Sequence, residues 1–294
     1  MAKARALDKR RKSIKNIRKI TRTMELVSTA QFRRAMERAI AAKSYTDRIV
    51  RLVADLARAG LNAEHPLLAP RESKKRAALL ILTANRGLCG GYNSGVLRSG
   101  LARLEELRRE YDEVELVVSG KRGVSFLKYR HYEIARSFTQ FDDKPAYDEV
   151  VAIANEFLTR FRSGDLDRID VAYSKFTSLS KQSPVAETLA PLTSMTTEIE
   201  SQSAEASGEV EYEFLPSPQS ILEEVVPSAF KVKFFKCFLD AAVSEQIARM
   251  MAMKAATDAA DEMISTLTTT YNRARQSQIT NEIIEVISGA SALQ

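Results

Sequence analysis

Two long stretches that lack helix-breaking residues occupy the two ends of the chain. Residues 1–59 and 228–288 contain neither glycine nor proline. In the first stretch, mainly apolar or small side chains recur at alternating spacings of three and four: Phe32, Ala35, Ala39, Ala42, Thr46, Ile49, Val53 and Leu56. This spacing is typical of the buried face of a coiled coil.

A second apolar stripe precedes the first one along the chain. Its members are Ile17, Ile20, Met24 and Val27. They follow the same spacing but lie about one residue out of phase with the stripe that begins at Phe32. We therefore expect a local change of supercoil near Gln31.

The C-terminal stretch predicts a helix of similar length. Small and apolar side chains gather on one of its faces: Ala241, Ser244, Ala248, Ala252, Ala255, Ala259, Met263, Leu267, Thr270 and Ala274. Small side chains allow close helix approach, although a mean spacing of about 3.6 predicts no long regular supercoil. Each terminal helix would be about 90 Å long, too long for a compact core to cover. The two helices are therefore expected to pair with each other, antiparallel.

Between these stretches, short apolar runs alternate with amphipathic segments. The predicted strands cover residues 77–83, 114–118, 132–138, 169–176 and 210–215, and the predicted helices cover residues 96–111, 124–129 and 147–161. Strands that alternate with helices favour an α/β layer with a mostly parallel sheet. The predicted fold is α/β, a long antiparallel coiled coil of the terminal helices with an inserted Rossmann-like domain.

Glycine and proline positions indicate where these parts meet. The N-terminal coiled-coil helix is assigned to residues 1–60, the α/β domain to 61–227 and the C-terminal coiled-coil helix to 228–294. Pro227 is expected to open the last helix. The acidic, serine-rich segment 198–208 is expected to form an exposed loop.

The charge of the chain is concentrated at one end. Residues 1–60 contain 17 Lys and Arg against 5 Asp and Glu, which gives this segment a net charge of +12. The whole chain has a net charge of +6, so the remaining residues carry −6. Ten of these basic residues lie within residues 3–22, with Asp8 as the single acid. Three interpretations compete: a solvated helix face, a nucleic-acid binder, or a surface that meets an acidic protein. Because the first aromatic residue is Phe32, an acidic protein fits better than a nucleic acid.

Targeting and redox features add little. The basic N-terminus has the composition of a transit peptide, but its pattern continues directly into the helix. No window of 18 consecutive apolar residues exists, so membrane association is expected only through a partner. Cys89 and Cys237 are the only cysteines and have neither disulfide-framework nor metal-ligand spacing, which indicates a reducing compartment.

The segment 85–93, Asn-Arg-Gly-Leu-Cys-Gly-Gly-Tyr-Asn, follows the first predicted strand and precedes a helix. Phosphates bind at this position in many α/β folds. The segment lacks both the Gly-Lys-Ser/Thr of a P-loop and the G-x-G-x-x-G spacing. A tight turn that needs glycine is the favoured interpretation.

Cys89 could serve as a nucleophile near a helix N-terminus, but such a thiolate normally needs a histidine base. The chain has only His65 and His131. A buried small side chain is the favoured interpretation. No paired carboxylates and no Ser/His/Asp set point to catalysis, so the chain is not expected to be an enzyme.

The C-terminal run 271–293 begins polar and ends apolar, with Ile279, Ile283, Ile284, Val286 and Ile287. Taken alone, it predicts a helix that packs in a core. Residues 1–20, however, offer few apolar partners for it. An exposed apolar tip would have to sit inside another protein.

Three motifs carry a resemblance to the gamma subunit of F-type ATP synthases. They are the segments 17–34 (IRKITRTMELVSTAQFRR), 85–93 (NRGLCGGYN) and 248–293, the last including MAMKAATDAADEM and YNRARQSQITNEIIEVISGASAL. The motifs occur in order, and the resemblance extends over nearly the whole chain.

The resemblance implies a non-catalytic rotor shaft without cofactor or metal. In this family the terminal helices turn inside a ring of three alpha and three beta subunits, which carries the catalytic sites. The α/β domain and lower coiled coil stand on the membrane c ring and bind epsilon. The implied location is the cytoplasmic side of the bacterial inner membrane, peripheral, with no role for nucleic acid. The rival hypotheses are a coiled-coil scaffold that binds nucleic acid through residues 3–22, and an α/β enzyme that uses Cys89.

The resemblance also implies contact residues. The positions implied to engage beta, or to support that contact, are Met24, Arg33, Arg34, Arg249, Arg275, Gln276, Thr280 and Glu285. Those implied to contact the c ring or epsilon are Tyr212, Phe214 and Leu215. A smooth bearing at the tip is expected from Val286, Ile287, Ala290 and Leu293.

Two positions depart from the family pattern. Asn85 stands where the family often has an acid, so the loop is less able to form a local ion pair. Leu215 stands where an acid is expected beside aromatic residues, which puts the details of the c-ring contact in doubt.

Overall fold

The computed structural model describes residues 2–58, 66–68, 71, 73–141, 144–192 and 218–291. The chain divides into two compact units. One combines residues 1–29 with 249–294 and is called the coil unit below, and the other consists of residues 30–248 and is called the sheet unit. Two helices, α1 (Ala2–Arg58) and α6 (Pro218–Ser291), contribute to both units.

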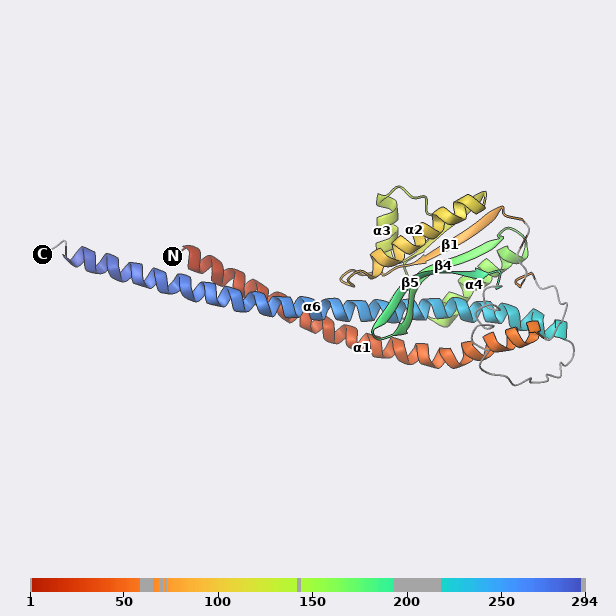
Figure 1. Ribbon diagram of the computed structural model, residues 1–294, viewed down its shortest axis with the longest axis horizontal. Coiled ribbons are helices and arrows are strands. Elements are labelled where there is room, and N and C mark those ends of the chain that lie inside the picture. Colours follow the sequence, from red (N-terminus) through yellow and green to blue (C-terminus); the bar gives the residue numbers. More distant parts are fainter. Residues whose placement is uncertain are drawn as a thin grey trace. The chain divides into compact units, whose positions relative to one another are not determined.

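The sheet unit contains one five-stranded sheet of order β3-β2-β1-β4-β5. Its strands are β1 (Arg76–Leu82), β2 (Glu113–Ser119), β3 (Arg136–Phe138), β4 (Arg168–Ser178) and β5 (Lys181–Ala190). Neighbouring strands from β3 to β4 are parallel, whereas β5 is antiparallel to β4. Helices α2 (Tyr92–Glu110), α3 (Lys121–Tyr129) and α4 (Tyr147–Arg162) connect the parallel strands, as the alternating pattern predicts (Figure 1).

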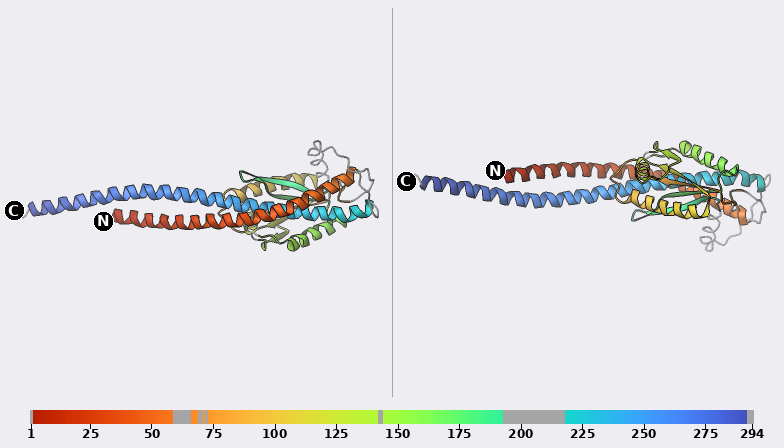
Figure 2. Two further views of the ribbon diagram at one scale, coloured as in Figure 1. Left: turned by 90° about the horizontal axis from the view of Figure 1, so that it is seen from below. Right: turned by 90° about the horizontal axis from the view of Figure 1, so that it is seen from above.

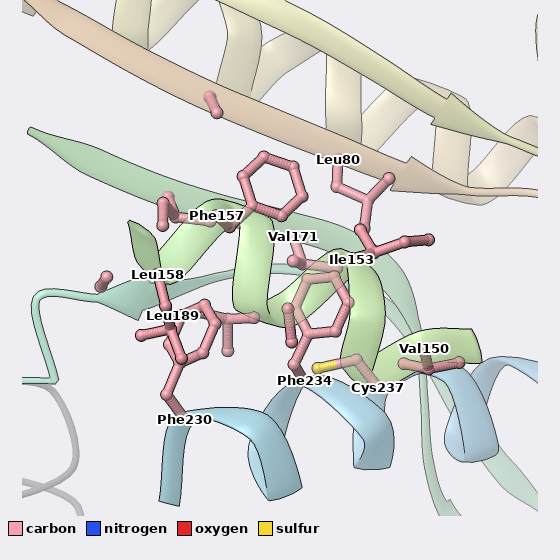
Figure 3. Packing of buried hydrophobic residues seen from close by; sticks show 14 of the residues in the cluster. Leu80, Val150, Ile153, Phe157, Leu158, Val171, Leu189, Phe230, Phe234 and Cys237 are labelled. Atoms are coloured by element: carbon pink, nitrogen blue, oxygen red, sulfur yellow. The ribbon is translucent and has the colours of Figure 1, made fainter. Parts of the chain in front are cut away.

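Two apolar layers sandwich the sheet because successive side chains of a strand point to opposite faces. Ala77, Leu79 and Ile81 of β1 pack with α2 and α3. Leu80, the residue between the last two, packs on the other face with α4 and α6. Figure 3 shows Phe234 on α6 pointing into this second layer. A central strand buried on both faces explains why residues 77–83 form a continuous apolar run.

Several predicted elements are confirmed with small shifts in their ends. The third strand is shorter than predicted, since β3 covers only Arg136–Phe138. The predicted strand 210–215 and loop 198–208 lie outside the described residues. Strand β5 was not predicted, because Pro184 and several polar residues obscure its apolar alternation. The last helix begins at Pro218 rather than at Pro227, which lies inside it.

The coil unit pairs the beginning of α1 with the end of α6 in antiparallel fashion. Thr21 is hydrogen-bonded to Thr257, and Arg18 forms an ion pair with Asp261. The guanidinium of Arg11 lies 4.8 Å from the ring centroid of Tyr271. Residue numbers fall along α1 as they rise along α6, which confirms the predicted antiparallel pairing. In Figure 2 the end of α6 extends past the start of α1.

The buried face of α1 within the coil unit differs from the predicted one. Ile17, Ile20 and Val27 are exposed, whereas Thr21 and Ser28 are buried. The predicted stripe is therefore wrong by one residue. The reason is that small side chains let the backbone of α1 approach α6, while the larger apolar side chains face outward.

The heptad register of α1 has no phase change near Gln31. Counting back from Phe32 in steps of four and three gives Ser28, Glu25, Thr21, Arg18, Ile14, Arg11, Leu7 and Ala4. All of these except Arg18 are buried or half-buried. The predicted stripe from Phe32 onward is confirmed as far as side chains are described, with Ala35 and Thr46 buried.

The predicted small-residue face of α6 is confirmed only in part, because Ala241 and Ser244 are buried and Leu267 and Ala274 are half-buried but other members are exposed. Ala255, Ala259 and Met263 are exposed, whereas Thr257 and Ala260 are buried. Eight of the buried and half-buried positions follow a regular 4-3 spacing: Met253, Thr257, Ala260, Ile264, Leu267, Tyr271, Ala274 and Gln278. This regular spacing was not expected, because it depends on which face α1 covers.

Candidate interaction surfaces

The inner face of the coil unit is narrow and partly polar. Its buried residues are Ala4, Thr21, Ser28, Met253, Thr257 and Ala260. The hydroxyl oxygens of Thr21 and Thr257 lie 2.8 Å apart, and the Thr257 oxygen also lies 2.9 Å from the carbonyl oxygen of Met253. These polar groups are therefore satisfied within the coil. Small side chains bury little apolar area, so the pairing gains little from the hydrophobic effect.

The outer face of α1 carries the larger apolar side chains. Ile17, Ile20 and Val27 are 46%, 58% and 51% exposed, respectively, and Met24 on the same stripe is half-buried. We call these four residues the outer stripe. Fully burying one such side chain is worth about 1.5–3 kcal/mol. An apolar stripe left in water along several helical turns marks a surface that another protein covers. Sequence reasoning placed these residues in the buried face and so missed Ile17, Ile20 and Val27 as contact residues, although the family resemblance implied Met24.

A basic surface accompanies the outer stripe on α1. Lys9, Arg10, Lys15 and Lys19 are all exposed. Hydrogen bonds from Lys12 and Arg11 hold the pKa of the Asp8 carboxyl below its ordinary value, so this acid stays ionised and its negative charge is balanced by these two cations. The surface keeps a net positive charge, which suits an acidic protein partner.

The end of α6 is an exposed helix that carries many apolar side chains. Residues 279–288 are all exposed, because the inner face of the coil unit ends at half-buried Gln278. Val286 and Ile287, two of the predicted bearing residues, are 71% and 60% exposed. The side chain of Ala290 and all of Leu293 lie outside the described residues.

The other predicted contact residues are spread over both units. Those on exposed helix surface are Arg33, Arg34, Arg275, Gln276, Thr280 and Glu285. Arg249 is only 5% exposed, so the chain itself covers most of its side chain. Tyr212, Phe214 and Leu215 lie outside the described residues.

The loop 85–93 is held by two asparagine side chains. The amide nitrogen of Asn85 donates to the carbonyl oxygens of Thr139 and Phe141 at 3.0 and 2.9 Å, while its amide oxygen accepts from the backbone N–H of Lys121 at 3.0 Å. A carboxylate could not donate to two carbonyls. Asparagine at this position therefore fixes the loop by neutral hydrogen bonds in place of an ion pair.

Asn93 closes the other end of the same loop. Its side-chain oxygen accepts from the backbone N–H of Ala84 at 2.9 Å, and its nitrogen lies 3.1 Å from the sulfur of Cys89. Cys89 is 2% exposed, which agrees with its interpretation as a buried small side chain. His131 is exposed at the end of α3, and His65 lies outside the described residues.

Two searches bear on other kinds of site. Within the described ranges, no group of three or more His, Cys, Asp or Glu side chains could hold a metal ion. Among the helices that the structure describes, none is sufficiently long and apolar to span a bilayer.

Comparison with known proteins covers the chain from end to end. The family model described as ATP synthase matches residues 3–293. The gamma chain of the ATP synthase of Rhodopirellula baltica is 58% identical over 295 residues, which cover all of both chains. The gamma chain of Leptospira biflexa is 41% identical over 293 residues, again covering both chains completely.

Solved structures with the same fold come from mitochondrial ATP synthases. A chain of the Euglena gracilis OSCP/F1/c-ring structure aligns with a TM-score of 0.65 at 17% identity, covering 99% of this chain and 95% of that one. A chain of the Tetrahymena thermophila central stalk/c-ring structure aligns with a TM-score of 0.57 at 18% identity, covering 81% and 99%. The full-length sequence matches, together with a sheet unit between two long terminal helices, establish that the chain belongs to the ATP synthase gamma chain family.

Proposed function

We propose that this chain is the central-stalk rotor of an ATP synthase, which couples ion flow through a membrane c ring to ATP synthesis or hydrolysis in a ring of alpha and beta subunits. Membership of the gamma chain family over the full length supports this role. The catalytic sites belong to the beta subunits, so the rotor needs no active site of its own. The nucleic-acid scaffold has no support from the relatives, and neither does an enzyme that uses Cys89.

One observation carries the proposal beyond family membership: the outer stripe and the apolar tip of α6 are exposed in the isolated chain. A shaft inside a sleeve of subunits needs apolar contact on its outside and only a narrow contact between its two helices. Apolar surfaces also slide more readily than surfaces joined by directional hydrogen bonds, because dispersion and hydrophobic contacts have no preferred angle. The coil unit has mainly small and partly polar side chains on its inner face and apolar side chains on its outer face. This distribution suits such a shaft.

The asymmetry of the shaft supplies the coupling. The end of α6 extends past α1 and exposes several apolar side chains beside polar ones such as Thr280 and Glu285, whereas residues 1–60 carry a net charge of +12. A rotating surface of this kind presents a different face to each of three otherwise equivalent catalytic subunits. Each beta subunit is thereby driven through its open, loose and tight states in turn.

Finer features of the assembly are also part of the proposal. Met24, Arg33, Arg34, Arg275, Gln276, Thr280 and Glu285 contact beta, while buried Arg249 supports that contact from within the chain. Tyr212, Phe214 and Leu215 contact the c ring or epsilon, and Val286, Ile287, Ala290 and Leu293 form the bearing. The complex places the chain at the cytoplasmic side of a bacterial inner membrane. In this proposal, residues 1–60 and 228–294 form the coiled-coil shaft, and residues 61–227 form the α/β domain that stands on the c ring.

Reconstitution with alpha and beta subunits tests the role directly. We expect alpha and beta to hydrolyse ATP cooperatively only when this chain is present, and a bead attached to the chain to rotate during hydrolysis. Binding of the chain without an effect on cooperativity, or without rotation, would contradict the rotor function. Recovery of DNA or RNA in place of the ATPase subunits would favour the scaffold.

Substitution of Met24 by lysine tests the contact with beta. A buried or half-buried charge opposite an apolar sleeve is unfavourable, so Met24→Lys should reduce ATP-driven proton pumping in inverted membranes more than it reduces folding. Met24→Leu, which keeps the apolar volume, is the control. Normal pumping by the lysine variant would remove Met24 from the contact.

A further inference from the structure

The β4–β5 hairpin extends beyond the rest of the sheet. Strand β1 pairs with β4 only as far as Ala172, whereas β4 continues to Ser178 and pairs with β5 along that length. We call residues 173–185 the hairpin arm. At its base the ring of Pro184 lies close to Gly95 of α2, where an added Cβ would come within 3.4 Å of the proline.

The hairpin arm contacts both long helices of the sheet unit. Phe176 packs against an apolar cluster formed by Ala35 of α1 with Val243 and Ile247 of α6. Figure 1 shows the hairpin running from the sheet toward these helices. The arm therefore joins the sheet to α1 and α6 together.

A buried hydrogen bond anchors the hairpin arm to α6. The hydroxyl of Ser244 donates to the carbonyl oxygen of Ser174 at 3.0 Å, and both residues are buried. Ser174 lies opposite Pro184 in the strand ladder. Proline has no N–H, so the residue opposite cannot donate to this carbonyl. The serine of α6 supplies this carbonyl with a donor.

The arm is stiffened from within by a second set of polar contacts. Glu187 of β5 accepts hydrogen bonds from the Tyr173 hydroxyl at 2.9 Å and from the Lys175 ammonium at 2.7 Å. These bonds cross between the two strands near the base of the arm. A stiff arm can transmit force, whereas a flexible loop would absorb it.

The sheet is attached to α6 at another place as well. Phe230 and Phe234 of α6 lie in the core layer beneath the sheet. This layer continues along α6 to Ala241, and the arm extends the contact to Ile247, which lies about 25 Å from Phe230 at a rise of 1.5 Å per residue. A long attachment along α6 opposes tilting of the sheet, and contact with α1 as well as α6 opposes rotation of the sheet about the axis of α6.

We propose that the hairpin arm is a torsional strut, through which the sheet unit passes torque to α1 and α6, with Ser244 and Phe176 as its positioning residues. This inference rests on the proposed rotor function, because torque has to pass through the chain for the strut to matter. It adds a mechanical role for residues that touch neither nucleotide nor membrane.

The torsional stiffness of the connection between the sheet unit and the two long helices can be measured in the assembled complex, from the thermal angular fluctuations of an attached bead. Alpha and beta subunits are held on a surface without ATP, and a bead is attached through biotin to the sheet unit at Tyr129→Cys, an exposed site on α3. Cys89 and Cys237 are buried and should not be labelled. We expect Ser244→Ala and Phe176→Ala to widen the angular distribution of the bead relative to the unsubstituted arm.

Controls separate the strut from a merely structural role. Leu179→Ala shortens an exposed apolar side chain at the tip of the same hairpin and should leave the distribution unchanged. Ser244→Thr keeps the hydroxyl and should restore a narrow distribution. Thermal unfolding of each variant is measured in parallel, and Phe176→Leu replaces Phe176→Ala if the alanine variant does not fold.

A distribution as narrow in Ser244→Ala and Phe176→Ala as in the parent complex would overturn the strut, even if both variants lost thermal stability. Failure of the proposed function looks different, because the parent chain would then not rotate in the complex at all. The parent chain is therefore tested for ATP-driven rotation before the variants are compared.

Discussion

The sheet unit and the coil unit use their apolar side chains in opposite ways. The sheet unit buries its large ones, with Phe161, Phe230 and Phe234 completely enclosed. In the coil unit the buried side chains are mainly those of alanine, serine and threonine, whereas Ile17, Ile20 and Val27 are exposed. The first unit can stabilise itself, whereas the second becomes fully buried only when another protein surrounds it. Four predictions test this contrast, from the largest expected effect to the smallest.

Truncation of the sheet-unit core should have the largest effect. Phe234 has no exposed surface and stacks on Phe230 with centroids 5.9 Å apart. Phe234→Ala should lower the free energy of unfolding by about 3–5 kcal/mol because it leaves a cavity. Urea denaturation followed by circular dichroism measures the change. Tyr129→Ala, at an exposed site, should change it by no more than about 0.5 kcal/mol.

Substitution in the outer stripe should affect assembly rather than folding. Ile20→Asn should weaken binding of the chain to the alpha and beta subunits by about 1.5–3 kcal/mol, since an isoleucine that the partner covers is lost. The unfolding of the isolated chain should change little. Leu179→Asn removes an equally exposed apolar side chain outside the stripe and serves as the control. Equal losses of binding in the two variants would contradict a specific role for the stripe.

Glu187 should make the stability of the sheet unit depend on pH. Burial acts to raise the pKa of this carboxyl, but the hydrogen bond and charge of Lys175 outweigh it, with further help from Tyr173 and Lys233, so the pKa falls below its ordinary value of 4.5. A lowered folded pKa contributes stability that is present above pH 4.5 and is lost as the pH falls through the folded value. The nearby groups Asp240 and Cys237 also face this cluster.

The variant Glu187→Gln removes this contribution. At pH 7 it should be less stable than the parent chain by about 1–2 kcal/mol, because a charge-assisted hydrogen bond is lost at a partly exposed lysine. The difference should shrink as the pH is lowered toward 3. Denaturation midpoints measured across this range check the prediction, and a constant difference would exclude Glu187 as its source.

The threonine pair inside the coil unit should have the smallest effect. Thr21→Val should cost about 0.5–1.5 kcal/mol, since one hydrogen bond is lost while Thr257 keeps the carbonyl of Met253 as a partner. The double variant Thr21→Val with Thr257→Val should recover part of this loss, because both polar groups are then replaced by apolar groups of the same shape. A double-mutant cycle measures the coupling, and independent effects of the two substitutions would argue against their hydrogen bond.

Helix α1 shows how far a sequence pattern reaches. The stripe from Phe32 was predicted correctly as far as Ile49, because apolar or small residues occupy its positions and little else competes. The preceding turns were assigned one residue out of phase, because Ile17 and Ile20 are more apolar than Arg18 and Thr21. Hydrophobicity alone assigns the larger side chain to the inside. Continuing the register from Phe32 unchanged would have identified the outer stripe.

The loop 85–93 and strand β5 show the same limit in the sheet unit. The glycines of the loop correctly indicated a turn, yet the sequence could not indicate that Asn85 holds it, because the partners of Asn85 lie up to 56 residues away. Strand β5 contains Pro184 and polar residues, which argue against a strand locally. It forms because β4 offers it an antiparallel edge, where a proline is tolerated.

The sequence by itself determined the elements of this protein: two terminal helices, since no glycine or proline interrupts them, and a parallel sheet, since short apolar runs alternate with helices. Local propensity and periodicity act within a few residues, so they suffice for this. Only the tertiary structure decided which face of each long helix lies inside, and that Ser244 meets the carbonyl of Ser174 across 70 residues. Those choices depend on how closely two backbones approach, a property of the pair that neither segment contains alone.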